Sequence, residues 1–123
     1  MATWDAVRRL ALALPETSES TSYGAPSWKV RGKAFVWDRP LRKNDPSEAG
    51  PILGVRVADE GVKAALIADD PDVYFTIPHF DGYPAVLVRL ERIDPGELGE
   101  VITEAWLLQA PKRVAAAFLE ARE

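Results

Sequence analysis

The sequence contains no cysteine and only one histidine, His79. Without cysteine the chain cannot form a disulfide, supply a thiolate nucleophile or hold a metal through sulfur ligands. The lack of cysteine also fits a reducing compartment, so we expect a cytoplasmic protein. A lone histidine has no second imidazole with which to bind a metal, and no H-E-x-x-H or D-x-D-x-D-G pattern supplies other ligands. We therefore expect no metal and no cofactor.

Long apolar runs and an excess of basic charge are also missing. No apolar stretch approaches the roughly 20 residues that a membrane-spanning helix needs, so we expect no membrane association. The N-terminal stretch MATWDAVRRLALALPE is read as an amphipathic helix and not as a signal peptide. The net charge of −4 and the pI of about 5.1 argue against a surface that binds nucleic acid everywhere. They still allow a local basic face.

What is present predicts one domain over residues 1–123, with helices at both ends of the chain. Thr3 can cap a first helix, whose apolar residues recur at helical spacing from Trp4 to Leu14 before Pro15 ends it. Asp94 and Pro95 begin a long helix near the C-terminus, and Pro111 separates it from a last short helix over 112–121. A further short helix begins at Ala58 or Asp59, is expected to bury Val62, Ala65 and Leu66, and ends at 69–71.

The middle of the chain predicts strands. Residues 27–30 and 33–38 flank Arg31-Gly32, which reads as a tight hairpin turn with a positive φ at Gly32. Further strands are expected over 52–57, 73–77 and 85–92, whereas ETSESTSYGAPS and RPLRKNDPSEAGP read as loops, the second being the expected disordered segment. Strands in runs with helices between and after them predict an α+β fold: a mostly antiparallel sheet of about five strands with helices packed on one side.

The proline-bounded segment Pro78 to Pro84 holds His79, but catalysis there lacks support. A catalytic histidine needs a partner that orients or uses it, and the nearest acid in sequence, Asp81, lies on a turn. We interpret His79 as a loop residue, with a surface contact as the alternative. The hydroxyl-rich stretch from Thr17 to Ser22 has no nucleophile context, and no glycine-rich phosphate loop occurs. The sequence therefore predicts a protein that is not an enzyme.

Charge is distributed unevenly along the chain. Residues 29–43 carry six basic residues against one acid, interleaved with the aromatic residues Trp28, Phe35 and Trp37, whereas acids prevail over residues 44–72. A basic hairpin with interleaved aromatics could lie along a nucleic-acid backbone, with its cations neutralising phosphates. The alternative is that the aromatics are buried and the lysines only protect a sheet edge. The candidate phosphate-contacting residues are Lys29, Arg31, Lys33, Arg39, Arg42 and Lys43, joined by Lys112 and Arg113 if the fold brings them alongside.

Two other functions stay open. One is a protein- or peptide-interaction module, whose sheet would receive a partner strand or helix and expose Trp28, Trp37 and Tyr83. The other is a small-molecule site in a pocket between the sheet and the Pro78 to Pro84 segment. The residues expected to line that pocket are Tyr23, His79, Tyr83 and Trp106.

A series of short motifs, ordered and spaced along nearly the whole chain, resembles the MmcQ/YjbR family of small bacterial proteins. The motifs are Leu14 to Thr17, Tyr23-Gly24 with Pro26 before Trp28-Lys29-Val30, Gly32 to Phe35, Asp70-Pro71, Tyr74 to Thr76, Pro78 to Phe80, Gly82 to Pro84, Val86 to Leu90, Glu104 to Trp106 and Ala110 to Arg113.

The resemblance implies a two-layer α+β fold similar to that of type III secretion chaperones, and DNA binding through a double-wing arrangement of β-hairpins. It implies no catalytic residues. The matching positions are Gly32-Lys33 in the hairpin, the Pro78 to Pro84 loop and the junction from Trp106 to Arg113. The chain differs from this pattern in its acidic net charge and in the loop RPLRKNDPSEAGP.

Overall fold

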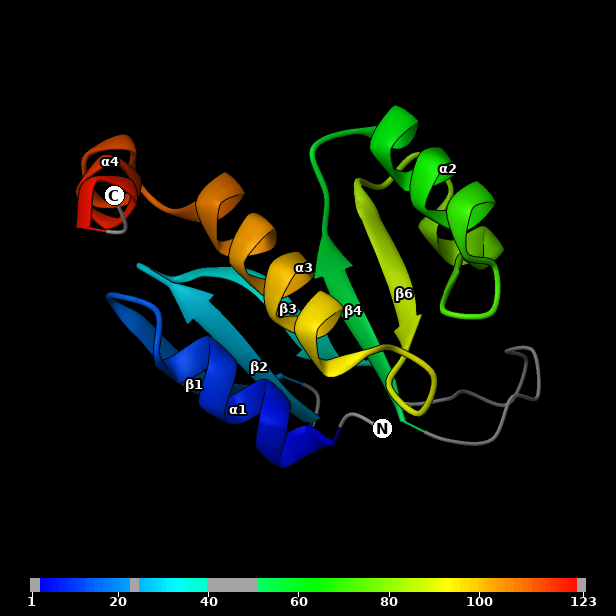
Figure 1. Ribbon diagram of the computed structural model, residues 1–123, viewed down its shortest axis with the longest axis horizontal. Coiled ribbons are helices and arrows are strands. Elements are labelled where there is room, and N and C mark those ends of the chain that lie inside the picture. The colour runs from blue at the N-terminus through cyan, green and yellow to red at the C-terminus, as the bar shows by residue number, and fades with distance from the viewer. Residues whose placement is uncertain (1–2, 23–24, 40–50, 122–123) are drawn as a thin grey trace.

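A computed structural model describes residues 3–22, 25–39 and 51–121 of the chain (Figure 1). Its strands form one open antiparallel sheet in the order β1-β2-β3-β4-β6-β5. The elements in chain order are α1 Trp4–Leu12, β1 Thr17–Ser22, β2 Ala25–Val30, β3 Lys33–Asp38, β4 Ile52–Arg56, α2 Glu60–Asp69, β5 Tyr74–Phe75, the 3₁₀ turn η1 Pro78–Phe80, β6 Ala85–Arg89, α3 Pro95–Gln109 and α4 Lys112–Ala121. The predicted α+β class is confirmed.

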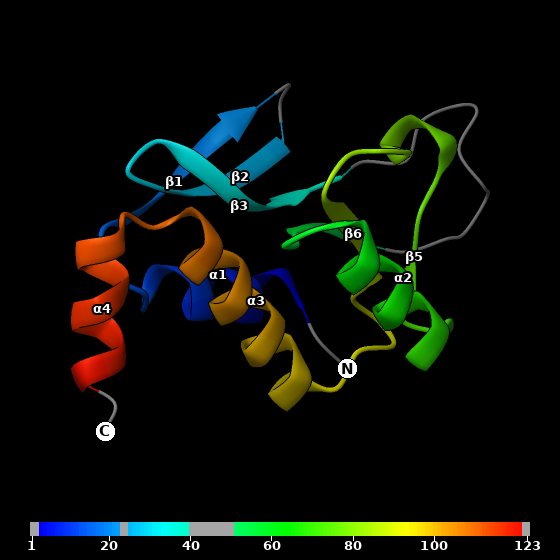
Figure 2. The same ribbon diagram turned by 90° about the horizontal axis from the view of Figure 1, so that it is seen from above.

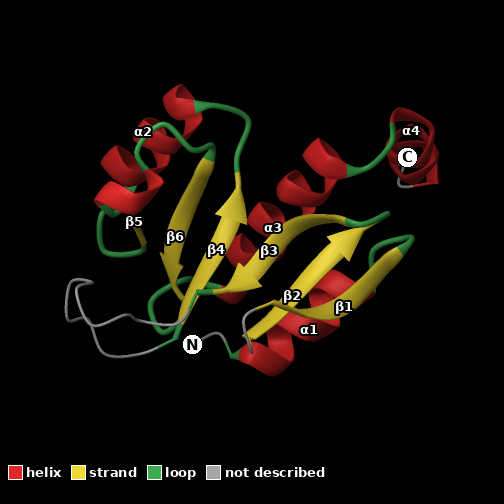
Figure 3. Ribbon diagram, turned by 180° about the vertical axis from the view of Figure 1, so that it is seen from behind, coloured by secondary structure: helices red, strands yellow, loops and turns green. Residues whose placement is uncertain are grey.

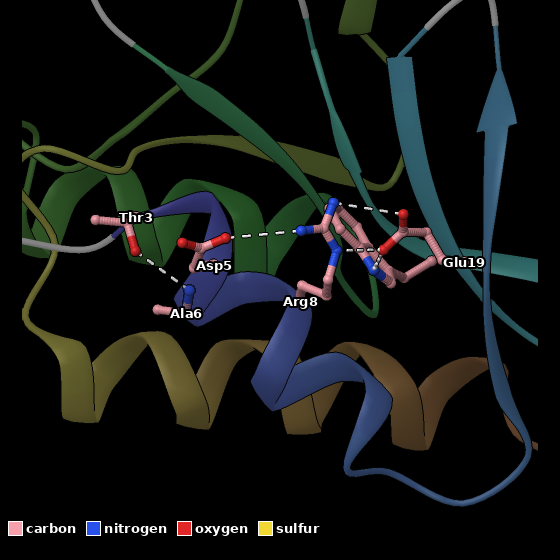
Figure 4. Close-up of polar contacts among 6 residues, drawn as sticks. Thr3, Asp5, Ala6, Arg8 and Glu19 are labelled. Carbon is pink, nitrogen blue, oxygen red and sulfur yellow. Dashed lines mark hydrogen bonds and ion pairs between the residues drawn. The ribbon is translucent and has the colours of Figure 1, made fainter.

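Helix α1 begins as its sequence predicts. The Thr3 hydroxyl accepts a hydrogen bond from the Ala6 amide, and Asp5 lies in the first turn, where the helix dipole favours an acid (Figure 4). Further along, Arg8 reaches Glu19 on β1, with Nε 2.7 Å from Oε1. The same Glu19 oxygen accepts a hydrogen bond from the Trp28 indole at 3.0 Å. These contacts join the first helix to the first two strands.

The first strand is where the sequence-based prediction was wrong. Residues 16–27 were expected to form a loop, but Thr17–Ser22 pairs with Ala25–Val30 along its whole length and makes a sixth strand at the sheet edge. Its sequence, TSESTS, lacks the apolar alternation by which a strand is recognised. An edge strand with polar side chains needs only its backbone pairing, and that pairing depends on β2.

A β-bulge in the central hairpin changes which residues face the core. Trp28 pairs with Val36 and Lys29 with Ala34, so that Phe35 is the extra residue between them. As a result Phe35 and Val36 both enter the main core, although strict alternation would have placed them on opposite faces. Beyond the bulge, Trp37 lies opposite Gly54 on β4.

The main core lies between the sheet and the helices. Helices α1 and α3 cross one face of the sheet; Figure 2 shows both helices on the same side of the strands, and Figure 3 shows the opposite face, with α1 and α3 behind the sheet. The largest side chains buried there are Trp28, Trp106, Tyr74 and Phe35. A smaller apolar cluster on the opposite face is formed by Ile52, Ile77, Phe80, Ala85 and Leu87, with Trp37 and Phe75 packed against it. The segment around η1 therefore covers the face that the long helices leave free.

Several element boundaries differ from prediction. The strand expected over 73–77 is reduced to Tyr74–Phe75, and the strand expected over 85–92 ends at Arg89. The expected buried face of α2 is confirmed in part for Leu66, which is half-buried against the main core, but Val62 and Ala65 are exposed and Lys63 is buried instead. The predicted loop over residues 39–51 lies almost wholly outside the described residues.

Helix α4 lies at one end of the molecule and buries none of its residues fully. Its residues Val114 and Phe118 pack against the main core, and the Phe118 ring centroid is 4.9 Å from that of Trp106. Across the described part of the chain, no helix has the length and apolar character needed to cross a bilayer.

Candidate functional site

The hairpin turn presents two basic side chains at one end of the sheet. Arg31 and Gly32 both have positive φ, 50° and 86°, and Val30 pairs with Lys33 across the turn. Two central residues with positive φ make a type I′ turn, which matches the twist of the flanking strands. Arg31 and Lys33 are exposed.

The position of Arg31 is set by Glu16. The Glu16 carboxylate accepts a hydrogen bond from Arg31 Nε, and the Glu16 carbonyl oxygen lies 3.4 Å from the Arg31 amide nitrogen. This hydrogen bond and the charge of Glu16 raise the pKa of Arg31, so its guanidinium stays charged. One acid therefore partly neutralises the turn, while Lys33 has no ion-pair partner among the described residues.

A side-chain contact brings a second basic pair to the same end. The Gln109 amide at the end of α3 donates a hydrogen bond to the carbonyl of Ala34 at 3.0 Å. Lys112 and Arg113, which open α4, follow Gln109 closely, and Lys33 precedes Ala34. Figures 1 and 2 both place α4 at the same end as the β2–β3 turn. We call Arg31, Lys33, Lys112 and Arg113 the basic end.

The helix dipole does not favour the position of Lys112 and Arg113 in the first turn of α4. The N-terminal turn of a helix carries partial positive charge, so acidic residues stabilise it and basic residues do not. Helix α4 has no acid in its first turn and carries these two exposed cations there. Their charge therefore adds to that of the hairpin turn at some cost to the helix.

The two remaining basic candidates that the structure describes, Lys29 and Arg39, do not join this end. Lys29 is half-buried and, by its pairing with Ser18 and Ala34, lies on the sheet face away from the long helices. Arg39 is buried, with 7% exposure, and its guanidinium carbon is 5.7 Å from the centre of the Phe80 ring. We therefore do not include Arg39 in the basic end, because its side chain packs against η1. Arg42 and Lys43 lie outside the described residues.

Trp106, one of the residues predicted to line a pocket, lies in the main core. The Trp106 side chain is fully buried in the main core, and its indole donates a hydrogen bond to the Pro15 carbonyl at 3.1 Å. Tyr83 is exposed, with its ring stacked edge-on against Phe80 and covered by the Arg56 guanidinium. Tyr23 lies outside the described residues, as does the side chain of His79 within η1.

The exposed aromatic surface expected of an interaction module on the sheet is also smaller than predicted. Trp28 is completely buried, and Trp37 is half-buried over Gly54. Of the three aromatics expected on the surface, only Tyr83 is exposed.

Sequence analysis missed Lys63, which determines the shape of the Pro78 to Pro84 loop. Lys63 is 3% exposed, and its ammonium donates to the carbonyls of Phe80 at 2.6 Å and Tyr83 at 3.1 Å, with Glu60 Oε1 at 3.4 Å. A charged group at such a position is normally retained only when hydrogen bonds compensate its burial. No sequence signal marks Lys63, because lysine on a short helix is usually solvated.

The described residues contain no group of three or more histidine, aspartate or glutamate side chains arranged to hold a metal ion. Two groups with raised pKa lie away from the basic end. Burial and a hydrogen bond to Glu97 raise the pKa of the Tyr74 hydroxyl, and burial raises the pKa of Asp38. Neither group lies among the residues of the basic end.

A protein-family model described as YjbR matches residues 12–108. The chain belongs to the YjbR family. It is 56% identical, over 97% of each chain, to "Uncharacterized protein Rv2570" and "Uncharacterized protein MT2646" of Mycobacterium tuberculosis, and equally to "Uncharacterized protein Mb2600" of Mycobacterium bovis. The predicted family is thereby confirmed.

The fold of this YjbR protein is similar to that of a solved structure. The crystal structure of Deinococcus radiodurans protein DR2400, with the family-model domain DUF419, matches with a TM-score of 0.72 at 20% identity. The match covers 92% of this chain and 82% of the other. At this identity the likeness concerns the fold. The matched family region includes Arg31 and Lys33, whereas Lys112 and Arg113 follow it.

Proposed function

We propose that this YjbR protein is a non-enzymatic cytoplasmic protein that binds DNA weakly, through phosphate contacts made by the basic end. The supporting observation is the hydrogen bond from Gln109 to the Ala34 carbonyl. It places Lys112 and Arg113 beside the hairpin turn that carries Arg31 and Lys33. Two separate stretches of sequence thus contribute cations to one surface.

The charge distribution supports this orientation. With a net charge of −4, the molecule as a whole repels nucleic acid, so binding needs a region in which cations dominate. The basic end supplies four cations against Glu16, while the acidic residues of α2 and of the segment after it lie toward the other end of the sheet. Contacts to phosphate carry no sequence information, so we expect little sequence preference.

The experiment is fluorescence anisotropy of a labelled generic duplex, titrated with the full chain at several salt concentrations. Up to four phosphate contacts predict that the logarithm of the binding constant falls with the logarithm of salt with a slope no steeper than about −4. Lys33→Glu and Arg113→Glu should each weaken binding to unrelated duplexes to the same extent.

Arg92→Glu is the matched control, because Arg92 is exposed, lies outside the basic end and undergoes the same change of charge. It should weaken binding much less than Lys33→Glu. Binding that does not depend on salt, no binding at low salt, or an equal loss in Arg92→Glu would each contradict the proposal.

A further inference from the structure

The helix side of the molecule contains an apolar groove that the basic end does not use. It lies between α2 and α3, above β4 and β6, and has a volume of about 280 Å³. In the view of Figure 1, β4 and β6 are seen between the two helices. The lining residues at the centre of the groove are Val55, Val57, Leu66, Val86 and Val101.

Exposed apolar side chains extend this surface beyond the groove itself. Val62 on α2 and Leu108 on α3 line the groove and are 41% and 46% exposed. The described residues include five large hydrophobic side chains that are exposed, and two of the five therefore border one groove. Removing such apolar surface from water favours a complex. A partner that covers Val62 and Leu108 as well as entering the groove would bury more apolar surface than one confined to the groove.

The rim of the groove is acidic. Glu100 and Glu104 both line it, and they lie four residues apart on α3, where like charges destabilise a helix. Neither carboxylate has a hydrogen-bond or ion-pair partner among the described residues. Arg56, the one cation that lines the groove, holds its guanidinium carbon 5.5 Å from the centre of the Tyr83 ring. Among the described residues, Arg56 makes no ion pair with either carboxylate.

We propose that this groove binds a cationic amphipathic helix of a protein partner. Apolar side chains spaced one helical turn apart would enter between α2 and α3 and cover Val62 and Leu108. Lysine or arginine residues beside that stripe would pair with Glu100 and Glu104. The same carboxylates repel phosphate, so this site is separate from the basic end and does not depend on the proposed DNA binding.

The test uses two synthetic peptides of about 14 residues with leucine at helical spacing, one carrying lysine and the other glutamate at all remaining positions. Each is titrated into the ¹⁵N-labelled full chain. The lysine peptide should shift amide resonances of α2, α3 and β4, and should bind at least about tenfold more tightly than the glutamate peptide, a difference of about 1.4 kcal/mol. The double variant Glu100→Gln with Glu104→Gln should remove most of that preference.

Leu108→Gln should weaken binding of the lysine peptide about tenfold or more, since it removes apolar surface without adding charge. Leu119→Gln is the matched control: Leu119 is 49% exposed, lies on α4 outside the groove, and should leave binding unchanged. Equal binding of the two peptides, or equal losses in the two leucine variants, would overturn the proposal. So would shifts confined to other elements. Groove resonances that shift with protein concentration alone would identify a second copy of the chain as the occupant and overturn it as well.

Discussion

At the scale of single residues, the tightest constraint is the contact between Gly54 and Trp37. A methyl group at position 54 would lie 2.3 Å from Cε2 and Nε1 of the Trp37 ring. The ring packs over the backbone of β4, in the apolar cluster that η1 completes. Any side chain at position 54 must therefore displace the indole.

Gly54→Ala should lower the free energy of unfolding by about 1–3 kcal/mol, because overpacking forces the tryptophan and its neighbours to shift. Gly99→Ala serves as the control, since its new methyl group would make only an ordinary 3.7 Å contact with Leu10. Being inside α3, Gly99→Ala should be neutral or stabilise the protein by up to about 1 kcal/mol. Chemical denaturation measures both, and similar values for the two variants would refute the steric account.

The burial of Lys63 on α2 could not be predicted from the local sequence. Helical periodicity selected Val62, Ala65 and Leu66 as the buried face of α2, yet the structure buries Lys63. Periodicity assigns apolar residues to the core, but the carbonyls of Phe80 and Tyr83 needed a donor at this position. That requirement arises from a loop about twenty residues away and is invisible in the local sequence.

At the scale of elements, the ion pair between Arg8 and Glu19 links α1 to the edge strand β1. The hydrogen bond from Arg8 is the largest effect on the pKa of Glu19 and lowers it; burial opposes this, while the charge of Arg8 and the hydrogen bond from Trp28 add to it, so the pKa lies below its ordinary value. The folded state thus favours the ionised carboxylate. Its contribution to stability is present above the pKa of the unfolded chain and is lost as the pH falls through the lower pKa of the folded chain.

We therefore expect Glu19→Gln to be less stable than the wild type near neutral pH, and the difference to shrink as the pH falls from about 5 to about 3. Denaturation at a series of pH values measures this difference. Glu120→Gln provides the control, because Glu120 is exposed on α4 and has no ion-pair partner among the described residues. Its difference from the wild type should stay near zero throughout. A Glu19→Gln difference that did not change with pH would show that the ion pair is not the cause.

The sequence predicted correctly the helix starts and the hairpin turn, which are marked by residues next to one another in the chain. Thr3 and Asp94 cap α1 and α3 as expected, and Arg31-Gly32 makes the predicted hairpin turn. The strand β1 was missed because its stability comes from pairing with β2 and from Glu19, both nonlocal. The bulge at Phe35 was missed for a similar reason, since two strands must be aligned before an extra residue becomes apparent.

At the scale of the whole molecule, charge is distributed unevenly: the basic end lies at one end of the sheet, and acids outnumber bases over described residues 56–92. The basic end contains Arg31, Lys33, Lys112 and Arg113, while Asp69 at the end of α2 and Glu91 after β6 are exposed at the other end of the sheet. If DNA binds as proposed, the distant acids act only through their long-range field. Salt screens such interactions beyond about 8–10 Å at 0.1–0.15 M ionic strength.

The double variant Asp69→Asn with Glu91→Gln should therefore bind a generic duplex about two- to threefold more tightly at low salt, and like the wild type at high salt. Lys33→Gln should instead reduce the salt slope by about 1, because it removes one phosphate contact. Anisotropy titrations over a range of salt distinguish the two effects. An advantage of the double variant that persisted at high salt would mean that the acids act by direct contact.

The sequence by itself determined the family, the α+β class, the helix caps and the hairpin turn, because these depend on residues close together in the chain. It also supplied the candidate cations. Only the tertiary structure decided which of these cations lie near one another. The hydrogen bond from Gln109 to the Ala34 carbonyl brings Lys112 and Arg113 to the end of the sheet that carries Arg31 and Lys33. Arg39 is not part of this group, because its side chain packs against Phe80. The groove beside Glu100 and Glu104 likewise forms because α2 and α3 pack over the same strands. Such features depend on contacts between residues far apart in sequence, which no local pattern encodes.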